Sequence, residues 1–343
     1  MLPQRLSPLG WTVIAAGVLL NSVSSGRAQV TEITTAFAAL RAEALWPVEG
    51  GVFDAMTSTF GPRIKASTGT HDWHRGIDLD APEGTPVRAP IDGVFFGLRN
   101  YPDGGLTVIL RHAFPTPVNY QGKSLSHYYT FYMHLSSVDL ALQEAAAAGQ
   151  TPAVPRGYHL GAVGHSGSAL DDHLHWELRV GSPYSLEWQL QNPTSQYGYN
   201  QFGFDPHMHP MFLAVPYTAH GMGLTLLKKP GKTTGTVRFS SNDDQPLLNR
   251  ILVQVKRRSD NRIMATHTLD LNQRTGYDAT STAALDTVNT TRPYLAPQPF
   301  GTLSPYVTDL MIPPTFVGSY TGTKYLTTVL VHDIWGRSTQ IAW

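Results

Sequence analysis

Cysteine is absent from the 343 residues of this chain. Disulfide bonds, thiolate zinc ligands and a lipid anchor on an N-terminal cysteine are therefore excluded. Charged residues make up only 15% of the sequence, with 25 basic and 25 acidic side chains. This balance provides no overall attraction to nucleic acid or to a membrane surface, so neither is predicted as a partner.

Apolar runs long enough to cross a bilayer comfortably are also missing, and the strongest apolar run lies at the N-terminus. Residues 9–20 are apolar, Arg5 precedes them, and the small-x-small sequence GRA follows at residues 26–28. This order is typical of a signal peptide, which we assign to residues 1–28. The mature protein is then exported, periplasmic or extracellular, with no stable membrane insertion. An uncleaved anchor is the alternative, and it also places the rest of the chain outside the cytoplasm.

The remaining sequence predicts a mainly β protein. It has 31 glycines and 25 prolines, which favour turns, and 41% apolar residues, which is enough for substantial cores. A short helical segment is expected over residues 29–45, because Ala, Leu and Glu are frequent there and Pro47 follows. A compact antiparallel β domain with short helices is expected over residues 46–215, with its clearest helix at residues 137–148.

The C-terminal part, residues 216–343, shows a strand-only pattern. Two pairs of apolar runs flank turn sequences at residues 259–261 and 335–337. Strands at this spacing, without a helical pattern, predict a β-sandwich domain of immunoglobulin-like type. Its basic cluster KKPGK (residues 228–232) is interpreted either as a contact for an anionic polymer or as a solvated turn.

Two polar groups stand out in the N-terminal part, HRGID at residues 74–78 and DHLHWE at residues 172–177. His173 and His175 are two positions apart, so on a strand they point to the same face of the sheet. His74 and Asp78 begin another apolar run and can also converge on one side. Two or three histidine nitrogens and one carboxylate oxygen form the ligand set of a catalytic zinc, which keeps a fourth position for water.

Further motifs accompany these groups in a fixed order. TFGPR (59–63) precedes the stretch HRGIDLDAPEGTPV (74–87), YMHLS (132–136) follows, and GYHLGAVGHSGS (157–168) leads into the His-Leu-His sequence. Together they resemble the lysostaphin-type (LytM-type) zinc metallopeptidases, a family of peptidoglycan endopeptidases. The resemblance covers approximately residues 46–180. It implies a zinc metallopeptidase domain whose substrate is peptidoglycan or another peptide.

The same resemblance implies roles for single residues. His74, Asp78 and His175 correspond to the ligands of one Zn2+ per chain, and His134 and His173 line the site without binding the metal. The chain has no His-Glu-x-x-His helix, so the glutamate base of proteases with that motif is missing. Histidine titrates near neutrality and can accept and return a proton, so we expect His134 and His173 to be catalytic. The sequence leaves open which of them is the general base.

Other polar residues receive less specific interpretations. Glu177 is expected to support the ligand strand, and His207 and His209 form a loop pair, with a second metal site or a plug over the first as alternatives. Asp171 and Asp172 make the rim of the site acidic, which favours a basic or amine-bearing substrate. The remaining histidines near the motifs match no ligand position and are interpreted as structural or substrate-lining: His71, His112, His127, His159 and His165.

The segment 114–129 is longer than a simple hairpin requires. It carries Lys123 and three tyrosines, Tyr120, Tyr128 and Tyr129. We expect it to shape the substrate groove.

Three functions agree with these features. The first is a zinc metalloendopeptidase that hydrolyses amide bonds in peptidoglycan stem peptides or cross-bridges, with a zinc-activated water and histidine assistance. The second is a non-catalytic wall-binding protein or an activator of another wall hydrolase, although such relatives have lost ligands and every ligand position is filled here. The third is a secreted protease against glycine-rich proteins, targeted by the C-terminal domain.

Overall fold

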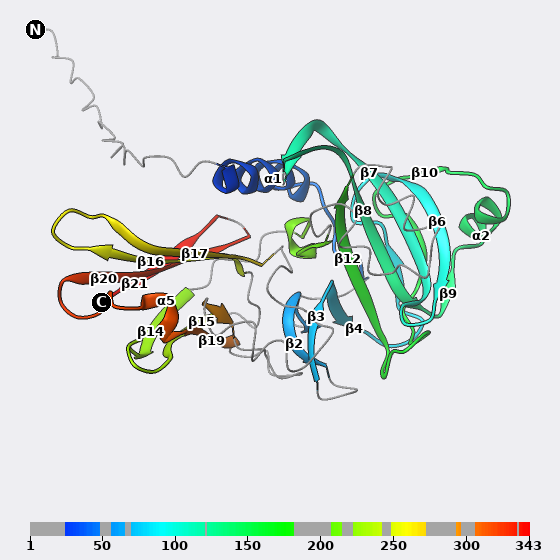
Figure 1. Ribbon diagram of the computed structural model, residues 1–343. Helices are drawn as coiled ribbons and strands as arrows, with labels where there is room; N and C mark the ends of the chain where they lie inside the picture. Colours follow the sequence, from blue (N-terminus) through cyan, green and yellow to red (C-terminus); the bar gives the residue numbers. More distant parts are fainter. Residues whose placement is uncertain are drawn as a thin grey trace, which may run out of the picture.

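The computed structural model describes residues 25–48, 56–65, 70–120, 122–181, 207–214, 222–241, 248–271, 293–295, 306–334 and 336–343. Its strands fall into an N-terminal part and a C-terminal part, which lie on opposite sides of Figure 1. All strand pairs are antiparallel and helices are few, so the prediction of a mainly β chain is confirmed.

An eight-stranded antiparallel sheet forms the centre of the N-terminal part. Its strand order is β1-β4-β12-β8-β7-β6-β10, and β13 pairs with β12 beside this path. The central strands β12 and β8 are buried over most of their lengths, as expected where both faces of a sheet are covered. The strands are β1 (Met56–Ser58), β4 (Ile77–Asp80), β6 (Gly93–Tyr101), β7 (Gly105–Tyr120), β8 (Lys123–Leu135), β10 (Ala153–Val154), β12 (His173–Gly181) and β13 (His207–Met208).

Smaller elements surround this sheet. A three-stranded sheet has the order β5-β11-β9, and β2 pairs with β3. The helix expected near residues 137–148 is α2, which Asp139 caps by accepting a hydrogen bond from the Ala141 amide at 3.1 Å. These elements are β2 (Gly61–Lys65), β3 (Thr70–His74), β5 (Pro86–Arg88), β9 (Ser137–Val138), α2 (Leu140–Ala147), β11 (His159–Ala162) and η3 (Pro210–Phe212).

The N-terminal helix α1 (Ser25–Arg41) packs on the long β7–β8 hairpin and on η3 (Figure 1). Phe37 is fully buried, and its ring lies 5.3–5.5 Å from the rings of Phe114, Tyr128 and Phe212. The helix begins and ends four residues earlier than the expected segment 29–45. The predicted signal peptide lies mostly outside the described residues, and no described helix has the length and apolar character of a membrane span.

This packing corrects one expectation about the 114–129 segment. Tyr120, Tyr128 and Tyr129 are all at most 1% exposed, so they belong to the core and do not line a substrate groove. The extra length of the hairpin has a different role, because its apolar side chains give α1 a surface to pack against.

The C-terminal part consists of two four-stranded antiparallel sheets with the orders β14-β15-β19-β18 and β17-β16-β20-β21. Both predicted strand pairs are present, as β16 with β17 and β20 with β21. Two sheets with alternating burial agree with a sandwich, and the immunoglobulin-like topology stays a prediction. The elements are β14 (Met222–Lys228), β15 (Gly235–Ser241), β16 (Leu248–Arg257), β17 (Ile263–Asp270), β18 (Tyr294–Leu295), β19 (Tyr306–Ile312), α5 (Pro314–Val317), β20 (Tyr325–Asp333) and β21 (Ser338–Ala342).

The two parts of the chain are in contact. Their buried apolar side chains form one connected cluster. At the end of α1, Arg41 is only 6% exposed; burial lowers the pKa of its guanidinium, and the nearby charge of Asp333 from β20 raises it. The C-terminal part therefore meets the N-terminal part at the end where β20 finishes.

We expect Phe37→Ala to lower the free energy of unfolding by about 3–5 kcal/mol, the usual cost of removing a buried phenylalanine ring. Urea denaturation followed by fluorescence measures this value. Leu140→Ala is the control, because Leu140 is 66% exposed and its loss should cost under about 0.5 kcal/mol. Equal effects of the two substitutions would show that α1 is not an integral part of the domain.

Candidate metal centre

Three predicted ligand residues come together between β3, β4 and β12. His74 ends β3, Asp78 lies in β4, and His175 lies opposite Asp78 in the β4–β12 register. The three ligand atoms are 2.7–3.2 Å apart: His175 Nδ1 to Asp78 Oδ1 at 2.7 Å, His74 Nε2 to His175 Nδ1 at 3.0 Å and His74 Nε2 to Asp78 Oδ1 at 3.2 Å. Tetrahedral ligands at roughly 2.1 Å from a zinc are roughly 3.4 Å apart, so this group could hold such an ion.

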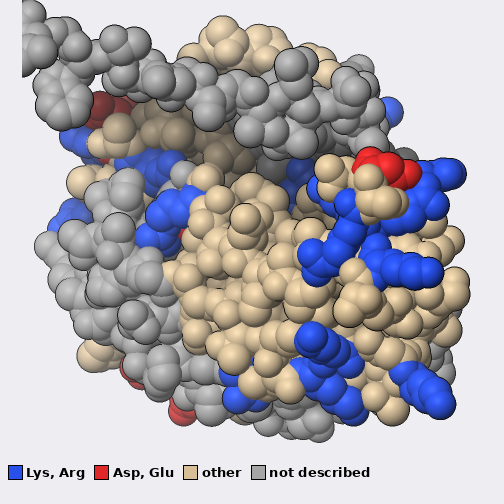
Figure 2. Space-filling model, turned by 90° about the vertical axis from the view of Figure 1, so that its left-hand side faces the viewer, with Lys and Arg blue, Asp and Glu red and all other residues tan. Residues whose placement is uncertain are grey.

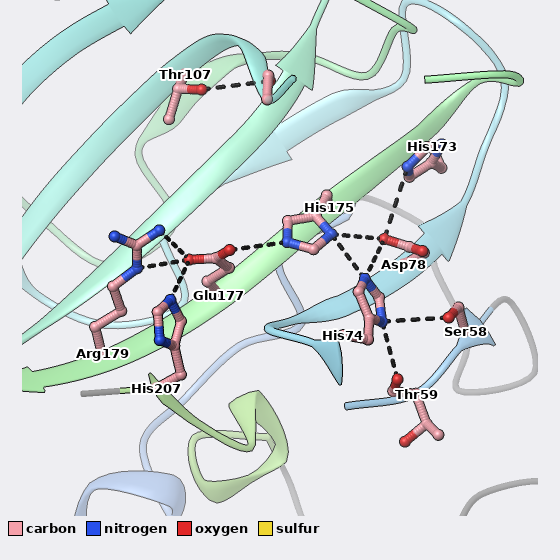
Figure 3. A network of polar contacts seen from close by, with 11 residues as sticks. Ser58, Thr59, His74, Asp78, Thr107, His173, His175, Glu177, Arg179 and His207 are labelled. Carbon is pink, nitrogen blue, oxygen red and sulfur yellow. Dashed lines mark hydrogen bonds and ion pairs between the residues drawn. The ribbon is translucent and has the colours of Figure 1, made fainter. Parts of the chain in front are cut away.

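The outer nitrogens of both ligand histidines have partners of their own (Figure 3). His74 Nδ1 lies 2.9 Å from the Thr59 carbonyl oxygen and 3.2 Å from Ser58 Oγ. His175 Nε2 lies 3.1 Å from Glu177 Oε1. When the two rings are neutral, each outer nitrogen donates its proton to an oxygen, and the inner nitrogens His74 Nε2 and His175 Nδ1 direct their lone pairs at the centre of the group. This is the arrangement that metal-bound histidines require.

Strand β12 provides a polar face and an apolar face. His173, His175, Glu177 and Arg179 occupy alternate positions on the polar side, whereas Leu174, Trp176 and Leu178 are fully buried on the other. The polar face thus extends from the ligand group into the interior of the domain. The period of two that identified the histidine pair also applies to Glu177, which was expected to support the ligand strand, and to Arg179, which the sequence analysis did not connect to the site.

Glu177 is a buried carboxylate with three partners. Arg179 donates to Glu177 Oε2 from its Nε at 2.6 Å, His207 Nε2 lies 3.5 Å from the same oxygen, and His175 contacts the other oxygen. Arg179 also lies over the ring of Phe131, 3.8 Å from its centroid. Burial alone would raise the pKa of Glu177, but Arg179, His175 and His207 hold it well below its usual value. A permanently charged carboxylate therefore orients His175 from behind.

A glycine is required between the first two ligands. A Cβ at Gly76 would lie 2.4 Å from the Trp176 carbonyl oxygen, 2.9 Å from His175 Nε2 and 3.0 Å from Glu177 Cγ. Any side chain there would push His175 and Glu177 apart. This explains the glycine in the HRGID sequence.

The two predicted catalytic histidines lie beside the ligand group. The ring of His134 is 4.8 Å from that of His173 and 5.8 Å from that of His175, centroid to centroid. His134 Nδ1 donates to the Ser166 carbonyl oxygen and His173 Nδ1 to the Asp171 carbonyl oxygen, each at 2.8 Å. Both histidines consequently carry the lone pair on Nε2, where a proton can be accepted.

His134 has a left-handed backbone with φ of 63°, which is unusual for a residue other than glycine. Its amide donates to the Gly104 carbonyl at 2.8 Å, and its carbonyl accepts from the Ser166 amide at 3.3 Å. The turn at residues 103–105 can approach the loop at residues 166–168 because Gly105 and Gly167 have positive φ and no side chain that would clash. Strain of this kind persists where the surrounding structure holds a functional residue in place.

Burial and neighbouring charges separate the pKa values of the site. Burial lowers the pKa of His134 to about 4, with a further contribution from the charges of His175 and His173, so His134 is neutral at pH 7. Burial also disfavours the charged form of His175, but hydrogen bonds to Asp78 and Glu177 raise its pKa to about 9. Asp78 would have a raised pKa from burial, yet His74 and His175 lower it well below the usual value.

The other histidines are distributed elsewhere. His112 is buried and bonds to the Asp92 carbonyl and to Thr130 Oγ1, each at 2.8 Å, and burial lowers its pKa to about 4. His207 and His209 are buried and do not act as the expected loop pair. His207 lies in β13 beside Glu177, whereas His209 caps η3 and its ring lies 5.5 Å from that of Phe60.

A second group of possible ligand atoms lies at the rim, formed by Glu83, His165 and Asp172. Glu83 and His165 are exposed and Asp172 is half-buried, and Asp172 Oδ1 accepts from His165 Nδ1 at 2.6 Å. This pairing raises the pKa of His165, and it compensates part of the acidity that we expected from Asp171 and Asp172.

The mainly β fold and the buried His-Asp-His group are the features expected of a metallopeptidase domain. Residues 72–186 match the model of Peptidase family M23, which confirms the resemblance to lysostaphin-type enzymes over this part of the chain.

Two curated relatives carry names that describe wall enzymes. "DD-carboxypeptidase/endopeptidase Mpg" of Neisseria meningitidis is 34% identical over 148 residues, which cover 43% of this chain and 28% of the relative. "Peptidoglycan DD-endopeptidase ShyC" of Vibrio cholerae is 30% identical over 145 residues, which cover 42% and 29%. The matched regions thus span less than a third of each relative. Among solved structures, a mutant catalytic domain of the prophage-encoded M23 protein EnpA from Enterococcus faecalis is 27% identical, with a TM-score of 0.30 over 41% of this chain and 90% of that chain.

The raised pKa of His175 predicts how the metal-free protein responds to pH. Its folded pKa of about 9 exceeds the ordinary 6.5, so the stabilisation is complete below pH 6.5 and is lost as pH rises to about 9. The free energy of unfolding should fall by up to about 3 kcal/mol over this range. Urea denaturation in the presence of a chelator measures the slope. In His175→Asn the slope should disappear, and an unchanged slope would assign the effect to another group.

Proposed function

We propose that the protein is an exported zinc metalloendopeptidase that hydrolyses amide bonds in peptidoglycan stem peptides or cross-bridges. The observation that carries this proposal is the convergence of three ligand atoms within 3.2 Å of one another, with both outer histidine nitrogens engaged by oxygen atoms. The family match and the names of the relatives support the substrate class.

In this proposal His74 Nε2, Asp78 Oδ1 and His175 Nδ1 hold the ion. A zinc bound there supplies a water of lowered pKa and a positive charge that polarises the scissile carbonyl group. Thr59 and Glu177 keep the two histidine rings in the required tautomer and orientation. Asp78 is ionised at neutral pH, so its negative charge offsets part of the charge of the ion.

His134 and His173 perform the proton transfers. His134 is neutral, buried and held by the Ser166 carbonyl, so its Nε2 is a ready acceptor close to the ligand group. His173 is partly exposed, and its Nε2 lies 3.7 Å from Asp78 Oδ1. We assign His134 as the general base, because its lone pair is fixed by burial. His134 then returns to the leaving amine the proton that it accepted, and we assign His173, when it is protonated on both nitrogens, to the stabilisation of negative charge on the substrate oxygen.

The two other functional classes require different features of the site. A non-catalytic wall-binding protein has no need for a complete ligand set with oriented outer nitrogens. A protease against glycine-rich proteins requires the same chemistry, so only the substrate separates it from a wall enzyme. Digestion of purified peptidoglycan, with mass analysis of the released fragments and a chelator control, decides between the three. Fragments that appear only without chelator support the proposal.

Zinc content tests the ligand assignment. The purified protein should bind about one zinc per chain, and His74→Ala or His175→Ala should lose it, because two remaining ligands bind far more weakly. Atomic emission after dialysis provides the measurement. His159→Ala is the control, since His159 is an exposed residue of β11 outside the ligand group, and it should retain the metal. Full zinc content in both ligand variants would contradict the assignment.

Turnover tests the two neighbouring histidines. His173→Ala and His134→Asn should keep zinc but lower turnover by roughly 10²-fold or more, the scale for loss of a general acid or base. Asparagine is chosen at position 134 because it tolerates the left-handed backbone. Release of wall fragments provides the rate and metal analysis the occupancy. Near-normal turnover with full zinc would remove the residue from the mechanism, and His159→Ala again provides the baseline.

A further inference from the structure

Basic side chains gather at one end of the C-terminal part, which we call the distal face. They come from three segments: the β14–β15 turn, the β16–β17 hairpin and the residue before β20. The backbone joins two of these segments, because the Arg258 amide donates to the Lys324 carbonyl at 2.9 Å. The distal face comprises Lys228, Lys229, Lys232, Lys256, Arg257, Arg258, Arg262 and Lys324.

The distal face points away from the peptidase domain. In Figure 1 the β14–β15 and β16–β17 turns lie at the left, far from the sheet that carries the ligand group. The opposite end of this part contains Asp333, which is close to Arg41 of α1. Figure 2 looks onto the left-hand side of the molecule and shows Lys and Arg side chains spread over it, with few acidic groups among them.

The positive charge of this face is largely uncompensated. Within the three segments as described, Asp260 is the single acidic residue, and it accepts two hydrogen bonds from the Arg257 guanidinium at 3.0 and 2.5 Å. Among the described residues, the other seven basic side chains form no ion pair. Six of the seven are classed as exposed, and Lys256 is half-buried.

The balanced charge of the whole chain conceals a strong asymmetry. Residues 216–343 contain 13 basic and 8 acidic residues, whereas residues 1–215 contain 12 basic and 17 acidic residues. An anionic polymer is therefore attracted by the C-terminal part and weakly repelled by the catalytic part. Only the fold reveals that the excess positive charge is concentrated at the end remote from the ligand group.

We propose that the distal face binds the carboxylate groups of peptidoglycan stem peptides and so retains the enzyme on its polymeric substrate. This inference rests on the proposed function and names the part of the chain that recognises the polymer. The basic groups project from turns and hairpins, an arrangement that suits separate carboxylates spread over a mesh. Each exposed ion pair is weak, but several pairs on one polymer keep the active site close to its scissile bonds.

The test is co-sedimentation of the full chain with purified sacculi, in chelator so that they are not digested. Binding should weaken as salt rises from about 0.05 to about 0.5 M, because exposed charges are screened. The triple variant Lys229→Gln, Lys232→Gln and Lys324→Gln should bind about tenfold more weakly at the lower salt concentration. Its rate on a short soluble wall peptide and its thermal unfolding should be unchanged.

A matched variant carries the same change in charge on the peptidase domain, with Arg99→Gln, Lys123→Gln and Arg156→Gln. It should bind sacculi like the unmodified protein. The inference would be overturned if the distal-face triple variant bound sacculi as tightly as the unmodified protein, or if both triple variants lost binding equally.

The apolar side chains of Leu227 and Ile263, beside the distal face, are 49% and 45% exposed. A second experiment therefore measures binding of the protein to vesicles of anionic phospholipid. Binding to vesicles without binding to sacculi would assign a membrane as the partner and also overturn it.

The experiments distinguish a failure of the proposed activity from a failure of the proposed role of the distal face. If sacculi are bound through the distal face but release no fragments when zinc is restored, the proposed activity fails and the wall-binding role stands. If fragments are released while both triple variants bind equally, the activity stands and the role of the distal face fails.

Discussion

The structure depends on one electrostatic constraint, the close approach of His74, Asp78 and His175 in a buried space. Three electron-rich atoms within 3.2 Å of one another require a cation or a shared proton at their centre. In the metal-free protein a proton on His175 meets this need, which is the reason for its raised pKa. Any ion that binds must displace that proton, so ligand protonation and metal affinity are coupled.

The surrounding fold holds the three ligand atoms together although these electron-rich atoms repel one another. The β4–β12 register places Asp78 opposite His175, while β2 and β3 bring His74 to the same point. Behind the ligands, Glu177 is fixed by Arg179 and His207, which comes from a strand about thirty residues further along the chain. A buried carboxylate with these partners is costly to disturb, because removal of one partner leaves a charge without compensation.

Different constraints act on the outer parts of the molecule. Helix α1 covers the extended β7–β8 hairpin, and its end contacts the C-terminal part through Arg41. The N-terminal part and the C-terminal part are thus joined at one end of the C-terminal sheets, and the opposite end is left exposed with its basic turns. This division keeps the acidic N-terminal part separate from the positively charged end of the chain.

The sequence by itself predicted which residues come together at the site, because local rules act on neighbouring residues. Alternation in a strand placed His173 and His175 on one face, and the HRGID and YMHLS motifs identified the other residues. Strand patterns likewise predicted the hairpins at residues 259–261 and 335–337, and an alanine-rich run predicted the helix near residue 140.

Only the tertiary structure decided what lies between distant segments. It showed that Tyr120, Tyr128 and Tyr129 are buried, Tyr128 against Phe37 of α1 and Tyr129 against Phe96 in a separate apolar cluster. Whether an aromatic residue lines a groove or a core depends on what packs against it. It also separated His207 from His209, whose spacing resembles that of a ligand pair. Finally, it brought three basic segments to one end of the C-terminal part. The three segments lie far apart in the sequence, so the sequence alone did not indicate that their charges act together. The interaction between charges depends on their distance in space and not on their distance along the chain.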